Sequence, residues 1–265
     1  MEAAAENNIE FVVLDRPNPL GGIKVEGCIV EDGFISFVSQ FKIPYVHGLT
    51  VGELAKLLNE EGMLAGGKKC KLTVIPMQNW KREMTFNKTG LNWVMTSPHI
   101  PYKETPFYYV STGILGELGV ISEGVGYTIP FQTFAAEWID ADLLAQKMNG
   151  LFIPGVVFRP ITFKPYYGKN AQKTLHGVQL HITDYEKANL MSLQFYFLQA
   201  HNELYPDKNP FTLADPSRLT MFDKVCGTKE VRETFLINMK YKDIKELLSK
   251  DVKDFIQLSK KYYIY

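Results

Sequence analysis

The stretch Asp15-Arg16-Pro17-Asn18-Pro19-Leu20-Gly21-Gly22 follows directly on the apolar run from Phe11 to Leu14. A short apolar run bounded by turn residues is typical of a buried strand, so this loop is predicted to lie at the carboxyl end of a strand. In open α/β sheets, ligands bind at that end. The loop therefore predicts either a ligand-binding wall or a rigid turn with a local Asp15–Arg16 pair.

The composition excludes several classes of protein. Among 265 residues, 29 are Lys or Arg and 29 are Asp or Glu, so the chain has no basic field to attract nucleic acid. The three cysteines, Cys28, Cys70 and Cys226, show neither disulfide nor metal-site spacing. No apolar run reaches the length of about 18 residues that a membrane span needs, and no signal-peptide pattern is present. We therefore expect a globular protein with no nucleic-acid partner and no membrane span.

Helical and strand patterns alternate along the chain. The clearest is Thr50-Val51-Gly52-Glu53, a capping box that predicts a helix over about 51–61. A second capping box, Thr183-Asp184-Tyr185-Glu186, predicts a long helix to about Tyr205. Further patterns predict helices at 1–7, 107–117, 140–150, 228–236 and 241–261, and strands at 71–76, 156–163 and 177–183. The texture of the sequence changes near residue 150, where we expect a domain boundary.

Most catalytic signatures are absent. Gly113, Gly116 and Gly119 are spaced G-x-x-G-x-x-G, which is not the dinucleotide-binding fingerprint, and no Walker-type loop is present, so a nicotinamide- or flavin-dependent oxidoreductase is disfavoured. The serine-hydrolase elbow and the H-E-x-x-H zinc motif are missing as well. What remains is a set of polar residues at the ends of predicted elements: Asp15, Arg16, Asn18, Glu26, His47 and Glu123.

Two of these polar residues are candidates for acid–base chemistry. His47 lies three residues before the predicted N-cap Thr50, where a helix dipole lowers the pKa of imidazole and favours its neutral form; the alternative is a histidine satisfied by local hydrogen bonds. Glu123, between Ser122 and Gly124, can approach a ligand closely, and the alternative is a solvated turn glutamate. Paired carboxyl groups would suit glycoside hydrolysis.

Several segments, taken together, resemble one known family. The chain resembles the bacterial exo-β-N-acetylmuramidases, also called NamZ-like and formerly classed as a domain of unknown function. The matching segments run in family order and are Phe11 to Gly22, Val25-Glu26-Gly27, His47 to Leu54, Ser97-Pro98, Ser122-Glu123-Gly124, Pro130-Phe131 and Gly177 to His181.

The resemblance implies a fold, an activity and a setting. The fold class is α/β, with the C-terminal part of a Rossmann-like parallel-sheet domain at 1–150, a smaller ancillary α/β domain at 151–265, and an active-site cleft between them. The activity is release of N-acetylmuramic acid from the non-reducing ends of peptidoglycan fragments during cell-wall recycling. The implied partners are peptidoglycan-derived muramyl sugars, no cofactor or metal is expected, and the setting is periplasmic or secreted.

The resemblance also assigns roles to single residues. Glu123 and His47 are the expected catalytic residues. The expected substrate-binding residues are Asp15, Arg16, Asn18, Glu26 and Ser97. Arg16 is the candidate for gripping the lactyl carboxylate of muramic acid, because a guanidinium binds a carboxylate bidentately.

Two departures from the family pattern keep an alternative open. Family members begin with a long further segment, whose Pro-Glu-His-Gly glutamate is the favoured catalytic acid, so this chain is expected to match only the C-terminal two thirds. Val125 stands where the family usually has arginine. The alternative is a non-catalytic sugar-binding remnant, with an exposed strand edge and apolar surface.

Overall fold

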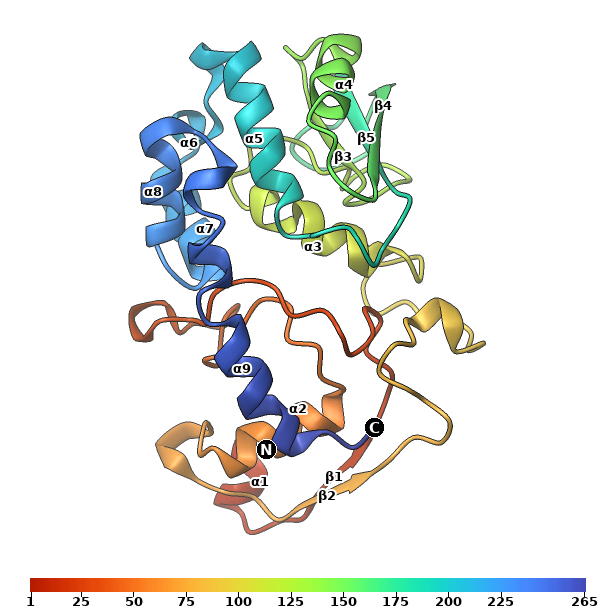
Figure 1. The fold of residues 1–265 in the computed structure, drawn as a ribbon, viewed down its shortest axis with the longest axis vertical. Helices are drawn as coiled ribbons and strands as arrows, with labels where there is room; N and C mark the ends of the chain where they lie inside the picture. The colour runs from red at the N-terminus through yellow and green to blue at the C-terminus, as the bar shows by residue number, and fades with distance from the viewer. The chain divides into compact units, whose positions relative to one another are not determined.

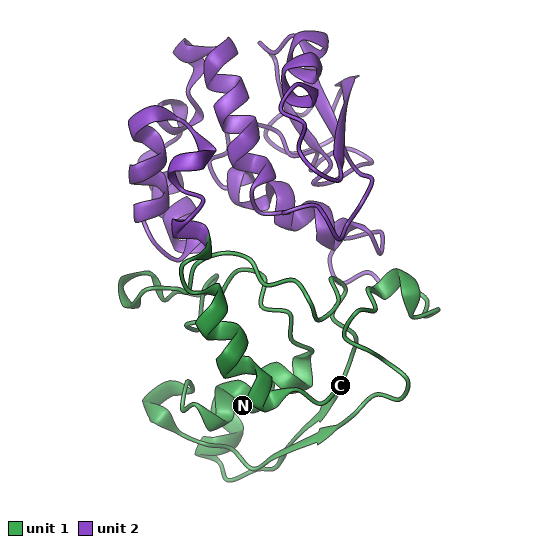
Figure 2. Ribbon diagram, in the orientation of Figure 1, with its two compact units in different colours: residues 1–93, 249–265 green, residues 94–248 purple.

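The computed structural model describes residues 1–265, which form two compact units (Figure 2). Unit 1 consists of residues 1–93 and 249–265, and unit 2 consists of residues 94–248. The division therefore lies elsewhere than near residue 150. The reason is that strand β3 (Thr133–Ala136) pairs with strand β5 (Leu175–Ile182), which joins residues before 150 to residues after it.

Unit 1 is built around a two-stranded parallel sheet (Figure 1). Strand β1 (Phe11–Leu14) pairs with β2 (Leu72–Ile75) in the register Phe11↔Leu72 to Leu14↔Ile75. Both strands are where the sequence predicts them. Three helices complete the unit: α1 (Glu2–Glu6), α2 (Val51–Glu60) and α9 (Val252–Ser259).

The prediction that β1 is a buried strand is wrong for most of its residues. Only Val13 is buried, whereas Val12 is 52% exposed and Leu14 is 66% exposed. Helix α2 contacts both strands, so the two-stranded sheet is covered on the side of α2 and leaves apolar side chains of β1 in solvent. Parallel sheets normally bury both faces. This sheet leaves apolar side chains in solvent, which is the exposed apolar surface that the sequence predicts.

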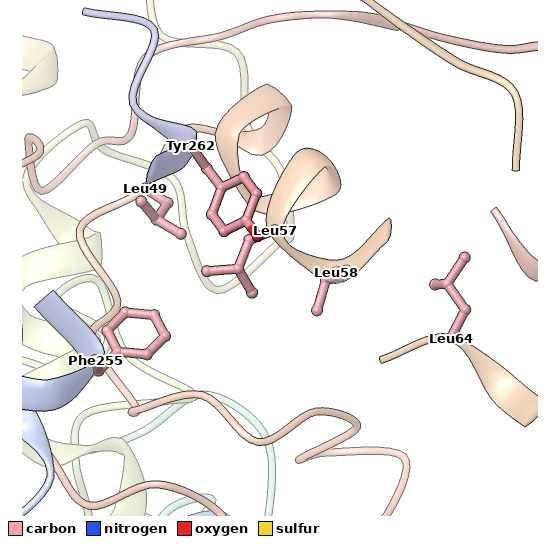
Figure 3. Close-up of a cluster of buried hydrophobic side chains, with 6 residues drawn as sticks. All are labelled: Leu49, Leu57, Leu58, Leu64, Phe255 and Tyr262. Carbon is pink, nitrogen blue, oxygen red and sulfur yellow. The ribbon is translucent and has the colours of Figure 1, made fainter. Parts of the chain in front are cut away.

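The core of unit 1 joins helix α2 to the C-terminal segment (Figure 3). Its buried residues are Leu49, Leu57, Leu58, Leu64, Phe255 and Tyr262. The first four come from α2 and its flanks, and the last two come from α9 and the turn after it. Residues some 200 positions apart in the sequence therefore share one core.

The continuous helix predicted over 241–261 is wrong. The segment contains short 3-10 turns, then α9, and then another 3-10 turn. Ile244 and Leu248 are buried in unit 2, whereas Phe255 is buried in unit 1. The amphipathic pattern is real, but its two halves belong to different units. Asp251 lies at the start of α9, and its carboxylate accepts a hydrogen bond from the Ile29 N–H.

Unit 2 contains an antiparallel sheet of order β3-β5-β4 with helices around it (Figure 1). Strand β4 (Val156–Phe163) pairs with β5 from Val156↔Ile182 to Phe163↔Leu175. The helices are α3 (Thr105–Gly116), α4 (Ala141–Asn149), α5 (Leu193–Leu204), α6 (Pro210–Leu213), α7 (Pro216–Cys226) and α8 (Glu230–Asn238). The α/β class predicted from the sequence is confirmed.

The second capping box does not start a helix. Helix α5 begins at Leu193, and the Asp184 carboxylate instead caps a turn, accepting the N–H groups of Glu186 and Lys187 at 3.1 and 3.2 Å. The carbonyl of Gly155 takes the N–H groups of Thr183 and Asp184, so tertiary contacts hold this segment outside a helix.

Helix α7 is not among the elements predicted from the sequence, although its ends carry clear signals. Asp215 caps it by accepting the N–H of Ser217 at 2.8 Å, Pro216 is its first residue, and Gly227 ends it at φ +81°.

Short 3-10 turns connect the larger elements. They are Asp32–Phe34, Ala65–Gly67, Phe86–Lys88, Pro206–Lys208, Tyr241–Asp243, Leu247–Ser249 and Lys260–Tyr262. None of the helices is long and apolar enough to cross a membrane.

The start of α2 is held by a buried ion pair. The predicted capping box is confirmed: Thr50 Oγ1 accepts the Glu53 N–H, and Glu53 Oε2 accepts the Thr50 N–H at 3.0 Å. Glu53 is 0% exposed, and its Oε1 accepts Nη1 of Arg82 at 2.7 Å and the Ile264 N–H at 2.9 Å. Glu53 thus links α2 to the C-terminal segment.

Arg82 completes this link from a stretch with no regular structure. Its Nη2 donates to the carbonyls of Gly22 and Gly48 at 2.9 and 2.6 Å, and its guanidinium lies 3.4 Å from the ring centroid of Tyr263. One side chain therefore joins the 15–22 loop, the entry to α2 and the chain terminus.

We expect Arg82→Met to destabilise unit 1 by about 3–5 kcal/mol, because it leaves the buried Glu53 carboxylate without its cation. Native-state hydrogen exchange of the α2 amides measures the free energy of unfolding of unit 1 alone.

The matched control is Lys69→Met, which breaks the exposed Lys69–Glu60 pair at 2.8 Å and should cost at most about 1 kcal/mol. Equal losses of unfolding free energy in the two variants would mean that the buried Glu53–Arg82 pair does not stabilise unit 1.

Candidate functional site

Asp15 lies at the carboxyl end of β1, and its carboxylate accepts hydrogen bonds from the start of α2. Oδ1 accepts the N–H groups of Gly52 and Arg16 at 2.7 and 2.9 Å, and Oδ2 accepts the hydroxyls of Thr50 and Tyr265 at 2.7 and 2.8 Å. Free N–H groups and the helix dipole both favour a carboxylate at this position. With four donors bound, Asp15 acts in this structure to position the loop.

Gly52 makes this arrangement possible. A Cβ at residue 52 would lie 2.8 Å from Cγ of Asp15 and 2.6 Å from Cγ1 of Val74. Any larger residue would push the helix away from the strand.

Asn18 holds the other side of the loop. Its Nδ2 donates to the Leu49 carbonyl, and its Oδ1 accepts the Leu20 N–H, both at 2.9 Å. The loop is therefore a rigid structure fixed to the segment before α2, but it lacks the Asp15–Arg16 ion pair that the rigid-turn interpretation included.

His47 is half-buried beside this loop, and its Nδ1 accepts the Leu49 N–H at 3.1 Å. Burial lowers the pKa of His47 to about 4. The predicted direction is confirmed, but burial and not the helix dipole is the cause. Because Nδ1 accepts a hydrogen bond, the neutral ring carries its proton on Nε2 and offers it as a donor.

The other two candidates in unit 1 differ in exposure. Arg16 is exposed, and its guanidinium makes no ion pair with Asp15; only its backbone N–H contacts that carboxylate. Glu26 is 8% exposed, its backbone pairs with Val46, and its carboxylate lies 3.9 Å from Nζ of Lys24. Arg16 is thus the open cation of the loop, and Glu26 is a buried acid.

Glu123 lies in unit 2, on a tight turn next to strand β3. Ser122 and Ala135 exchange two backbone hydrogen bonds of 2.8 and 3.0 Å, and the Ser122 hydroxyl accepts the Gly124 N–H at 3.3 Å. Gly124 has φ +96°, and a Cβ there would lie 2.4 Å from the Ile129 carbonyl. The turn therefore requires the glycine at position 124 and is held by the hydroxyl of Ser122.

The Glu123 carboxyl packs against helix α3. A Cβ on Gly116 would lie 3.2 Å from its Cδ. Burial is the largest cause that raises the pKa of Glu123 to about 7; a hydrogen bond from its own N–H opposes this, and the charge of Glu117 adds to it. A carboxyl group that keeps its proton near neutral pH is suited to acid–base chemistry.

Charged groups gather around the C-terminal end of α3. Burial raises the pKa of Glu117, whose Oε2 lies 3.8 Å from Nη1 of Arg218, and Lys169 Nζ donates to the Gly119 carbonyl at 2.6 Å. The sequence offered no signal for these groups, because Lys169 and Arg218 come from distant loops and helices.

Ser97 is also in unit 2, where its hydroxyl accepts the His99 N–H at 3.3 Å within a turn. The structure thus brings Asp15, Asn18 and His47 together in unit 1, with Arg16 on the same loop. It places Ser97 and Glu123 in unit 2.

No group of three or more His, Cys, Asp or Glu side chains is arranged to hold a metal ion. A surface pocket of about 390 Å³ lies between α2, β2 and Ile264, and it contains none of the predicted site residues.

The raised pKa of Glu123 predicts a pH-dependent stability. An unfolded glutamate ionises near 4.5 and the folded one near 7, so the folded state loses stability as the pH rises through this interval. Glu123→Gln should therefore gain stability relative to the parent chain between about pH 5 and pH 8, and the Glu123 carboxyl carbon should titrate near 7 by NMR.

Glu137→Gln serves as the control, since Glu137 is exposed and paired with Lys173. A Glu123 titration midpoint near 4.5 would contradict the assignment.

Comparison with known proteins covers the whole chain. Residues 1–104 match the model for the N-terminal part, and residues 107–265 the model for the C-terminal part, of the exo-beta-N-acetylmuramidase NamZ. The peptidoglycan beta-N-acetylmuramidase NamZ of Bacillus subtilis is 40% identical over 265 residues, and the chain spans 62% of its length.

Two solved structures from Bacteroides fragilis, both of DUF1343 family proteins, also match over the full chain. One has 56% identity and a TM-score of 0.97, with 68% of its chain covered; the other has 28% identity and a TM-score of 0.76, with 69% covered. Sequence models, a curated relative and solved structures agree, and the chain belongs to the NamZ exo-β-N-acetylmuramidase family.

Proposed function

We propose that this chain takes part in hydrolysis of peptidoglycan fragments, releasing N-acetylmuramic acid from their non-reducing ends. The observation that carries the proposal is the Glu123 carboxyl, held on a glycine-dependent turn with a pKa raised to about 7. Membership of the family supports it, as does the name of the Bacillus subtilis relative, a peptidoglycan beta-N-acetylmuramidase. The chain spans 62% of that relative, so the activity itself is part of the proposal.

Glu123 is proposed to supply a proton during cleavage of the glycosidic bond. Glycoside hydrolysis needs a carboxyl group that stays protonated at working pH and can pass the proton to the leaving oxygen. Burial and the neighbouring Glu117 hold Glu123 in that state. Gln at this position could still donate a hydrogen bond but could not transfer a proton, which separates binding from chemistry.

Arg16 is proposed to bind the lactyl carboxylate that distinguishes muramic acid from other amino sugars. Its guanidinium is exposed, and the loop beneath it is fixed by the hydrogen bonds of Asp15 and Asn18. A cation on a rigid loop loses little conformational freedom on binding, and a guanidinium matches a carboxylate bidentately.

His47 is proposed to orient the sugar through its Nε2–H. The ring is neutral at physiological pH, so it can donate to a hydroxyl or an acetamido oxygen. Asp15 and Asn18 contribute by positioning the loop. Roles for Glu26 and Ser97, the Rossmann-like class expected for the N-terminal part, cell-wall recycling and the periplasmic or secreted setting stay predictions.

We expect Glu123→Gln to lower the release of nitrophenol from 4-nitrophenyl β-N-acetylmuramide by about 100- to 10,000-fold, because general acid catalysis is lost. Binding of N-acetylmuramic acid, measured by calorimetry, should change little. Turnover of the parent chain should fall above about pH 7, where Glu123 loses its proton.

Glu137→Gln is the matched control and should keep full turnover, and the Bacillus subtilis relative serves as the positive control. Unchanged turnover in Glu123→Gln would remove Glu123 from the chemistry. A parent chain that binds the sugar but releases no nitrophenol would instead be a sugar-binding module.

We expect Arg16→Gln to weaken binding of N-acetylmuramic acid by about 10- to 100-fold, the value of a charged hydrogen-bond pair. Binding of N-acetylglucosamine, which lacks the lactyl carboxylate, should be unaffected. Arg159→Gln, a change at another exposed arginine, should alter neither. Equal losses for both sugars would show that Arg16 does not read the carboxylate.

A further inference from the structure

Two tyrosines in unit 2 are exposed on one short loop and have no role in the proposed function. Tyr166 is 67% exposed and Tyr167 is 51% exposed. Isolated exposed aromatic side chains are common, whereas two consecutive ones on an ordered loop are a candidate ligand-binding feature.

Each tyrosine is held by a stacked neighbour. The ring of Tyr166 stacks on Tyr127 with centroids 5.6 Å apart and planes 22° apart, and the ring of Tyr167 stacks on His99 at 6.0 Å and 17°. Tyr127 in turn packs on the buried Phe163 at 4.9 Å. The tyrosines are therefore fixed in orientation while much of their surface faces solvent.

The tyrosine loop is joined to the turn that carries Glu123. The Tyr166 N–H donates to the Gly126 carbonyl at 2.7 Å, and Gly126 lies three residues after Glu123. Gly126 has φ +94°, and a Cβ there would lie 2.3 Å from the Tyr167 carbonyl, so the two backbones are in direct contact. Lys169 ties the far side of the loop to the carbonyl of Gly119, just beyond the helix on which Glu123 packs.

The charge of the loop matches an anionic glycan. Lys164 and Lys169 flank the tyrosines, both are exposed, and no acidic residue lies between residues 164 and 173. Peptidoglycan carries carboxylates on its muramic acid residues, and a loop without acidic side chains does not repel such a glycan.

We propose that Tyr166 and Tyr167 form a subsite for the sugar ring on the reducing-end side of the cleaved bond. This rests on the proposed function of Glu123. An enzyme that removes terminal residues must hold two rings, and the ring that remains on the polymer extends toward solvent. Open, rigid aromatic faces on a loop that is hydrogen-bonded to the Glu123 turn suit the apolar face of such a pyranose ring.

The test is calorimetric titration with two ligands: N-acetylmuramic acid alone, and a sulfur-linked N-acetylmuramyl–N-acetylglucosamine disaccharide that resists hydrolysis. Tyr167→Ala should weaken disaccharide binding by about five- to tenfold, the value of one aromatic contact, and leave monosaccharide binding unchanged. Tyr167→Phe keeps the ring and should bind both ligands as the parent chain does. Tyr166→Ala should behave as Tyr167→Ala does.

Phe152→Ala is the matched control, because Phe152 is 87% exposed in the same unit but follows helix α4. Thermal melting of every variant checks that it is folded. Parent-like disaccharide binding by both alanine variants, or equal losses for both ligands, would overturn the subsite while leaving the proposed function intact. A parent chain that binds neither ligand would overturn both.

Discussion

Two carboxylates at the first turn of α2 hold unit 1 together. A helix start offers unpaired N–H groups and a partial positive charge, and this one is met by Asp15 from the preceding strand and by Glu53 from within the helix. Each carboxylate then reaches further, Asp15 to Tyr265 and Glu53 to Arg82 and Ile264. The shape of the 15–22 loop, and so the place of Arg16, depends on these contacts.

Burial acts in opposite directions on the two acid–base candidates. It lowers the pKa of His47 to about 4 and raises that of Glu123 to about 7, because in both cases the charged form is the one that loses solvation. Both groups are therefore neutral over much of the acidic to neutral range, and both can act as hydrogen-bond donors. A neutral hydrogen-bond donor in either unit suits a sugar, which presents hydroxyl and amide oxygens.

Local signals predicted the parts of the fold that local contacts decide. The capping box at Thr50, the strands at 11–14 and 156–163, and the helix that Asp140 caps are all present, because each depends on side chains within a few residues. The segment 241–261 and the box at Thr183 were predicted wrongly, because contacts with distant residues override the local pattern there. Arg82, Lys169 and the stacked tyrosines could not be predicted, since nothing near them in the sequence marks what they contact.

The core of unit 1 is shared between residues before position 93 and residues after position 249. A ribosome delivers the chain in order, so all of unit 2 leaves the exit tunnel before Phe255 and Tyr262 can reach Leu57. Unit 2 can complete its core before residues 249–265 are made, whereas residues 1–93 cannot complete the core that they share with those residues until then. Asp15 and Glu53 therefore gain Tyr265 and Ile264 as partners only after unit 2 has been synthesised.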